Sequence, residues 1–194
     1  MLAQLFGAVL AGAVNLAVWS TTISHFEAAQ DLAGGRTTMP GCVRTAMLFG
    51  QYFPNPGIFP QGVESRPAPV VTALHAMLVE ALGTFVLVLV IFLLIDRCNT
   101  AVHPAVVPPA IGATVAALIA VFAPQSQAGW NPARDLGPRI VAWAAGWGAS
   151  ALPGPGGGFW IYLVGPCVGS LLAGAVFFGA LRISDDECEN EKCK

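Results

Sequence analysis

The sequence predicts an all-α membrane protein with four membrane-spanning helices and one re-entrant half-helix. Three observations lead to this prediction: the composition, four long apolar blocks, and a short polar motif between the last two blocks. Hydrophobic residues make up 55% of the 194 residues and charged residues only 10%, whereas a soluble domain carries about 25% charged residues. A soluble protein with buried core helices is the alternative, but this chain has too few polar residues to cover such a core.

The four apolar blocks are each about as long as a helix that crosses a bilayer. A span needs about 20 apolar residues, and a helix satisfies its own backbone hydrogen bonds in lipid. The blocks are residues 1–19, 73–95, 105–123 and 159–181, and Glu80 and His75 are the only acidic or basic residues within them. We therefore expect a multi-pass protein of the lipid bilayer.

The segments outside the blocks differ in character. Residues 24–69 form a long polar stretch that contains the turn signals "YFPNPG" and "RPAP". We expect residues 1–183 to form the transmembrane domain and residues 184–194, "SDDECENEKCK", to be an acidic, disordered tail with two cysteines. The five cysteines are scattered and odd in number, which argues against a disulfide framework. The sequence predicts no metal site.

Small residues recur four positions apart in the first and last blocks. One such series is Ala3, Gly7 and Ala11, with Ala8 and Gly12 beside it. Another is Gly165, Gly169 and Ala173. Small residues at this spacing let two helices approach closely in lipid. We therefore expect a tightly packed helical bundle.

The stretch "AGWNPARDLGPR", residues 128–139, places polar and charged residues between two apolar blocks. Asn131 is a favourable N-cap residue and Pro132 suits the first helical position. About ten largely apolar residues follow, which is too short for a span and suits a re-entrant half-helix. The sequence thus predicts a helix that begins at membrane depth.

A helix that begins inside the membrane has consequences for solutes. Its first turn carries unpaired N–H groups and a partial positive charge, and irregular backbone is tolerated there only where protein or water surrounds it. Arg134 adds a fixed cation, and charged residues at that depth usually mark a solute pathway. We expect a pore wall that binds neutral polar solutes and repels cations and protons. The alternative is an Asn-Pro turn between two helices, with Arg134 and Asp135 in their interface.

The full arrangement resembles a known family. "GWNPARDLGPRI" followed by "AGWG" is similar to the second Asn-Pro-Ala box of the major intrinsic protein (aquaporin) family, in its glycerol-facilitator or aquaglyceroporin branch. "MLAQLFGAVLAG", "VEALGTFVLVLVIFLLID", "VPPAIGATVAALIA" and "GFWIYLVGPCVGSLLAGAV" resemble the third to sixth helices of that family. The resemblance covers residues 1 to about 183 and implies an aquaporin-like helical bundle.

The resemblance also implies roles for individual residues. Asn131, with Pro132 and Ala133, resembles the box whose asparagine donates hydrogen bonds to solute at the pore centre. Arg134 resembles the arginine of the selectivity constriction, and counting back without gaps puts Ala128 and Ile119 at two further constriction positions.

Three more residues complete the comparison. Asp135 and Arg139 resemble the acid and the base that mark the glycerol branch. Glu80 resembles the buried fourth-helix glutamate that supports the re-entrant loop. Ile119 and Tyr162 depart from the usual glycine and proline of glycerol facilitators, which leaves glycerol, urea, ammonia and water open as solutes.

The family builds its pore from two inverted repeats, with six spanning helices and two half-helices. This sequence starts at the third helix and lacks the first box, so we expect it to be N-terminally incomplete, to work with a partner, or not to conduct. The resemblance further implies homo- or hetero-tetramers and a location in the plasma membrane.

Two functional hypotheses follow. The first is a passive channel for small neutral solutes, with glycerol foremost and water or urea besides. The second is a non-conducting membrane protein that assembles with full-length aquaglyceroporins or regulates them. The sequence predicts no enzyme, because no nucleophile–base set, metal-ligand spacing or phosphate loop stands out. It predicts no cofactor, and a net charge of −2 does not favour nucleic acid.

Overall fold

The computed structural model describes residues 2–29, 42–59 and 71–182, and all the regular structure in these ranges is helical. In chain order the elements are α1 (Leu2–Ala29), α2 (Val43–Ala46), α3 (Ala73–Ile95), η1 (Pro104–Val106), α4 (Val107–Ser126), α5 (Pro132–Ala142), η2 (Trp143–Trp147), η3 (Gly148–Ser150), η4 (Pro155–Trp160), α6 (Ile161–Val176) and η5 (Phe177–Leu181). The tail predicted for residues 184–194 lies outside the described residues.

Four stretches of the described chain are long and apolar enough to cross a membrane, as the sequence predicted. They are Leu2–Ala29, Ala73–Ile95, Pro104–Ser126 and Pro155–Leu181. The first is longer than expected, because the polar loop was predicted to start at residue 24 and the helix continues to Ala29. The sequence from Ala13 to Ala33 contains neither glycine nor proline, so no helix breaker stops α1 at its polar residues.

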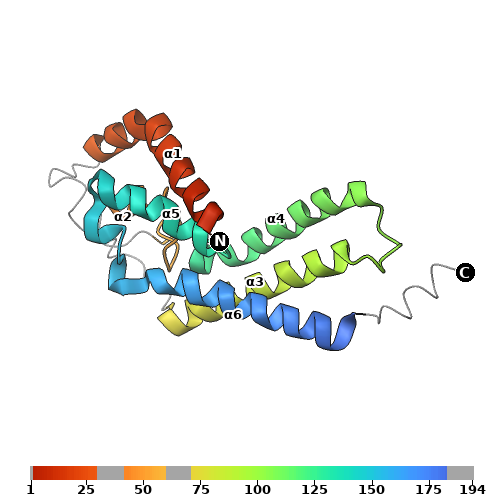
Figure 1. Cartoon of the computed structure of the whole chain (residues 1–194). Helices are drawn as coiled ribbons and strands as arrows, with labels where there is room; N and C mark the ends of the chain where they lie inside the picture. Colours follow the sequence, from red (N-terminus) through yellow and green to blue (C-terminus); the bar gives the residue numbers. More distant parts are fainter. Residues whose placement is uncertain (1, 30–41, 60–70, 183–194) are drawn as a thin grey trace, which may run out of the picture.

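The helices pack in two groups (Figure 1). In the first group α3 lies between α6 and α4, and in the second α1 lies along the half-helix α5. The two groups meet where α5 also contacts α6. The half-helix therefore lies between α1 on one side and the main group of helices on the other.

Glycines on α6 allow the close approach of α3 and α6. A Cβ atom at Gly165 would lie 2.8 Å from Cβ of Glu80, and one at Gly169 would collide with the carbonyl oxygen of Ala81. Ala173, the third member of this series, is fully buried. The series predicted from the spacing of small residues is therefore a helix–helix contact.

The contact between α1 and α5 uses Ala8 and Gly12, one of the two small-residue series predicted on α1. A Cβ atom at Gly12 would lie 2.8 Å from Cα of Pro138, and one at Gly137 would lie 2.5 Å from Cβ of Ala8. Gly7, by contrast, has no atom near its would-be Cβ and is exposed. Gly7 is therefore outside this contact, whereas Ala11 of the same series lines a pocket together with Arg134 and Pro138 of α5.

An apolar core lies at the end of the half-helix, away from α3, α4 and α6. It joins the later part of α1, the segment around α2, and the turns that follow α5. Its buried residues are Ile23, Cys42, Val43, Ala46, Phe49, Tyr52, Ala142, Trp147 and Ala151. This core fixes the segment before Gln51 against the end of the half-helix.

The three cysteines within the described residues are of two kinds. Cys42 and Cys167 carry free thiols, the first buried and the second exposed. Cys98, in the turn between α3 and α4, is disulfide-bonded. Spacing alone gave no sign of this bond, because the sequence has no close cysteine pair.

Candidate functional site

The half-helix α5 begins as its sequence predicts. Asn131 has an extended backbone, and its side-chain oxygen accepts hydrogen bonds from the backbone N–H groups of Ala133 at 2.9 Å and Arg134 at 3.2 Å. Pro132 occupies the first helical position, where no N–H is needed. Both Asn131 and Arg134 are exposed at this helix tip.

The loop before Asn131 has a strained backbone. Gln127, Ala128 and Trp130 all have positive φ angles, of 63°, 58° and 50°, although none of them is glycine. A left-handed backbone costs roughly 1–2 kcal/mol for such residues, so it persists only where surrounding contacts enforce it. Strain of this kind marks candidate functional sites.

Glu80 of α3 supplies contacts that enforce the loop conformation. One carboxylate oxygen accepts hydrogen bonds from the hydroxyl of Ser126 at 2.6 Å and the N–H of Gly129 at 3.0 Å. The other accepts the N–H of Trp130 at 2.8 Å. The side chain is fully buried. Glu80 thus satisfies three donors at the end of α4 and in the loop after it. The backbone carbonyl groups of the loop remain available for other partners.

The close contact between this loop and α3 requires a glycine in each of them. A Cβ atom at Gly129 would lie 3.0 Å from the Glu80 carboxylate and 3.0 Å from the Tyr162 ring. A Cβ atom at Gly83 would collide with the indole of Trp130, which packs over α3 at this point. The loop therefore lies directly on α3, with no room for larger side chains.

Arg134 extends over this loop. Its Nη1 atom lies 3.4 Å from the carbonyl oxygens of Ala128 and of Gly129. An open pocket in front of the guanidinium is lined by Ala11, Gly12, Asn15, Leu48, Phe49, Gln51, Arg134 and Pro138. The cation thus faces a space that α1, α5 and the segment before Gln51 form together.

One turn along α5, Asp135 and Arg139 form a buried ion pair. Nε of Arg139 lies 2.7 Å from Oδ2 of Asp135, and both side chains are at most 1% exposed. Arg139 also donates to the carbonyl oxygens of Ala151, at 2.8 Å, and of Gln51. Its guanidinium stacks over the Tyr52 ring at 4.6 Å. The two residues therefore anchor neighbouring segments to α5 and do not line the pocket in front of Arg134.

The segment from Gln51 to Asn55 is part of the site, although the sequence predicted turns here and no individual site residue. Tyr52 donates its N–H to the side chain of Gln127 at 2.6 Å. Asn55 donates from its side chain to the carbonyl oxygen of Ala123 at 2.9 Å, at the end of α4. The buried phenol of Tyr52 donates to Ser150, and burial raises its pKa to about 12. These residues could be assigned to the site only from their hydrogen bonds with distant buried partners. Those partners are brought together by the fold and leave no local pattern in the sequence.

The structure brings together most, but not all, of the residues predicted for the constriction. The buried Ala128 presents its carbonyl oxygen to Arg134. Ile119 lies on α4 with 42% of its surface exposed, and it is absent from the lining of the pocket around Arg134. Tyr162 is buried, with its ring against Gly129 of the loop, and it is also absent from the lining of that pocket.

The chemistry of the site is hydrogen bonding without a reactive centre. It offers an exposed asparagine amide, an exposed guanidinium and backbone carbonyls. Among the described residues no group of three or more histidine, cysteine or acidic side chains is placed to hold a metal ion. Such a surface binds hydroxyl, amide or water groups and disfavours cations.

Comparisons with known proteins place this arrangement in context. Aquaporin-10 of Homo sapiens is 30% identical over 158 residues, which cover 81% of this chain and 48% of that protein. Aquaglyceroporin-2 of Rhizophagus irregularis is 32% identical over 175 residues, covering 90% and 49%. Aquaporin-3 of Milnesium tardigradum is 33% identical over 186 residues, covering 94% and 51%. The chain spans about half the length of these relatives.

The fold has a match among solved structures. The X-ray structure of the aquaglyceroporin from Plasmodium falciparum aligns with a TM-score of 0.71 at 21% identity, covering 97% of this chain and 64% of that one. The sequence model of the family described as "Major intrinsic protein" matches residues 1–177. The fold is therefore an aquaporin-like helical bundle, and the chain belongs to the major intrinsic protein family.

Proposed function

We propose that this chain is part of a passive transmembrane channel for small neutral solutes, with glycerol as the main solute and water and urea as others. The relatives include proteins named aquaporin and aquaglyceroporin. Family membership also supports the expectation that the chain is not an enzyme. We further propose the plasma membrane as its location and a homo- or hetero-tetramer as its assembly.

One observation carries this proposal: the tip of α5 presents Asn131 and Arg134 beside the loop carbonyls. The side-chain oxygen of Asn131 is engaged as a helix cap, so its amide nitrogen is the part that remains for a solute. The carbonyl oxygens of Ala128 and Gly129 point toward the same guanidinium. A polyol hydroxyl both donates and accepts, so it can use the amide, the guanidinium and the carbonyls in turn.

Ion exclusion follows from the same groups. The positive end of α5 and the charge of Arg134 lie together at the tip. Either one opposes the approach of a cation, and both act strongly where water is scarce. A neutral polyol meets no such barrier. In this proposal Asn131 binds the solute, while Arg134 both binds it and repels cations.

The test is solute uptake by vesicles that contain the full chain. Reconstituted vesicles in a glycerol gradient should reswell faster than empty ones, by stopped-flow light scattering. Replacing Asn131 and Arg134 together should abolish this increase, and Arg134→Val alone should admit protons or cations. Correctly inserted protein that leaves the swelling rate unchanged would refute conduction by this chain.

A second candidate function is non-conducting assembly with a full-length aquaglyceroporin. One observation favours it: an almost wholly apolar groove lies uncovered at the tip of α5. The groove is lined by Leu2, Leu5, Pro132, Ala133, Leu136, Leu163 and Cys167. An apolar groove beside polar functional groups is a common feature of binding surfaces.

Co-reconstitution separates the two candidates. If this chain assembles with a full-length aquaglyceroporin, adding it should change the glycerol flux of that channel. The change should grow with the amount of this chain that co-purifies with the channel. Leu136→Arg, in the groove, should weaken both effects, because a charge there must be desolvated on assembly. Unchanged flux and no co-purification would leave only the channel proposal.

A further inference from the structure

We propose that Gln51 is the positioning residue that orients the guanidinium of Arg134. The inference extends the proposed function by adding a residue outside the Asn-Pro-Ala box to the same site. Only the transport arm of its test depends on that function, since the orientation of Arg134 is measurable without transport. Gln51 is 9% exposed and lines the pocket in front of Arg134.

The main chain of Gln51 is held in place independently of its side chain. Its N–H donates to Oδ1 of Asp135 at 2.7 Å, and its carbonyl oxygen accepts a hydrogen bond from Nη2 of Arg139. Both partners belong to the buried ion pair of α5. A change in the side chain of Gln51 therefore leaves these two anchors intact.

The side-chain amide bridges two charged groups. With the amide oriented to satisfy both neighbours, its nitrogen donates to Oδ1 of Asp135 at 2.8 Å and its oxygen accepts from Nη1 of Arg134 at 2.8 Å. The loop carbonyls of Ala128 and Gly129 lie farther from Nη1, at 3.4 Å each. Gln51 therefore makes the shortest of these three contacts with the guanidinium.

Asp135 determines which way the amide faces. A carboxylate accepts hydrogen bonds and does not donate them, so the NH2 group of Gln51 must face Asp135. The amide oxygen must then face Arg134. The buried ion pair is in this way connected to an exposed arginine, whose long side chain has many rotamers in the absence of a partner.

A neutral partner also preserves the charge of Arg134. Asp135 directs one oxygen to Arg139 and the other to Gln51, so a neutral amide separates it from the Arg134 guanidinium. A carboxylate at position 51 would bind Arg134 as an ion pair and cancel much of its field. The amide of Gln51 orients the guanidinium and leaves its positive charge able to repel cations.

The first arm of the test labels arginine in the membrane-embedded full chain. Phenylglyoxal modification of Arg134 is followed by mass spectrometry in wild type and in Gln51→Met, which keeps the side-chain length and removes the amide. Gln4→Met, at an exposed position of α1, makes the same chemical change elsewhere. Arg139, which is 1% exposed, serves as the internal reference for local unfolding.

We expect Arg134 in Gln51→Met to react severalfold faster, with Arg139 unchanged and Gln4→Met equal to wild type. An unchanged rate at Arg134 overturns the proposal. A parallel rise at Arg139 also overturns it, because the side chain would then serve the local fold and not Arg134 alone.

The second arm measures ion leak in vesicles that take up glycerol. Gln51→Glu should raise cation leak severalfold relative to glycerol uptake, a ratio that a purely structural role would not change. An unchanged ratio counts against the role in ion exclusion. If wild-type vesicles take up no glycerol, the proposed function fails, while the labelling arm still decides whether Gln51 positions Arg134.

Discussion

The carboxylate of Glu80 stabilises the strained loop through several hydrogen bonds. Its oxygens accept from Ser126, Gly129 and Trp130, and the left-handed residues lie within and beside this set. Each unsatisfied buried N–H costs roughly 1–3 kcal/mol. Removing the acceptor therefore penalises the loop twice, through lost hydrogen bonds and through strain that nothing then offsets.

Glu80→Gln should lower the free energy of unfolding by about 1–3 kcal/mol, because the amide NH2 must face an N–H or O–H donor that is left unsatisfied. The measurement is unfolding in mixed micelles, followed by circular dichroism. Ser126→Ala, which removes one donor to Glu80 and a long 3.4 Å contact with the Ala128 N–H but keeps the carboxylate, should cost less. Equal stability of Glu80→Gln and wild type would contradict the supporting role of Glu80.

The ion pair of Asp135 and Arg139 leads to a second expectation. Asp135→Asn leaves the Arg139 cation buried without its carboxylate, which should cost about 3–5 kcal/mol. The double variant Asp135→Leu/Arg139→Met removes both charges and should be more stable than Asp135→Asn. Unfolding titrations of the three proteins test this order. A double variant no more stable than Asp135→Asn would contradict the expected cost of leaving the Arg139 cation without its carboxylate.

Among the elements, the half-helix α5 could be predicted from its sequence, whereas the contacts that hold its start in place could not. Asn131, Pro132 and the short apolar run that follows carry local signals for a capped helix start. The contacts of Gln51 and Asn55 join residues 84 and 68 positions apart, respectively. No local pattern encodes such partners, so the segment looked like an ordinary turn-rich loop. The contact between Ala128 and Arg134 lies within one short stretch of sequence, whereas the position of Ile119 depends on how α4 packs.

Glycine spacing predicted contacts between helices better than it predicted which faces meet. Gly12 and Gly169 lie in helix contacts, whereas Gly7, in an equivalent series, faces open space. Spacing shows that a ridge of small residues exists, and the partner determines which ridge is used. The length of α1 was underestimated for a related reason, because polar residues without a helix breaker do not end a helix.

Gly169→Ala should destabilise the contact of α3 with α6 by about 1–3 kcal/mol, because the new methyl group collides with the backbone of Ala81. Gly174→Ala provides the matched control, since no atom lies near its would-be Cβ. The control should be neutral or stabilising by up to about 1 kcal/mol through helix propensity. Thermal unfolding in detergent compares the two, and similar losses in both would refute the close contact.

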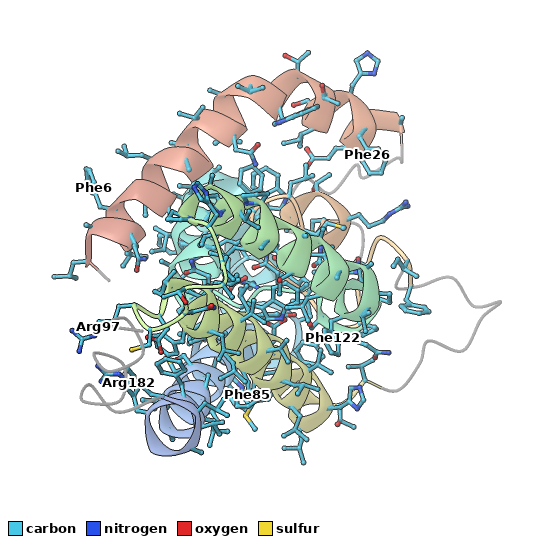
Figure 2. All side chains as sticks on the ribbon, turned by 90° about the vertical axis from the view of Figure 1, so that its right-hand side faces the viewer. Phe6, Phe26, Phe85, Arg97, Phe122 and Arg182 are labelled. Carbon is cyan, nitrogen blue, oxygen red and sulfur yellow. The ribbon has the colours of Figure 1, made fainter. Side chains whose placement is uncertain are left out.

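At the scale of the whole molecule, the exposed surface is strongly apolar. Along α1 the exposed residues include Leu2, Phe6, Leu10, Val14 and Val18, which recur every four residues. Phe6 points away from the rest of the chain (Figure 2). A stripe of this kind suits lipid or a neighbouring helix better than water.

The tryptophans provide a test of membrane insertion. Trp19, Trp143 and Trp160 are 50%, 56% and 40% exposed, whereas Trp130 and Trp147 are 8% and 0% exposed. Lipids brominated on their acyl chains should quench the first set. Trp143→Phe should therefore reduce the quenchable fraction of the fluorescence. If the fraction stays the same in correctly folded protein, Trp143 does not face lipid.

The segment from Gln51 to Asn55 has a consequence for biosynthesis. It leaves the ribosome well before the end of α4 and the start of α5, to which it binds. Until α5 has been translated, the backbone groups that later meet Asp135 and Arg139 must stay hydrated or find temporary partners. Correct assembly of the tip of α5 therefore waits for the late part of the chain, and a stalled nascent chain would display this loop without its partners.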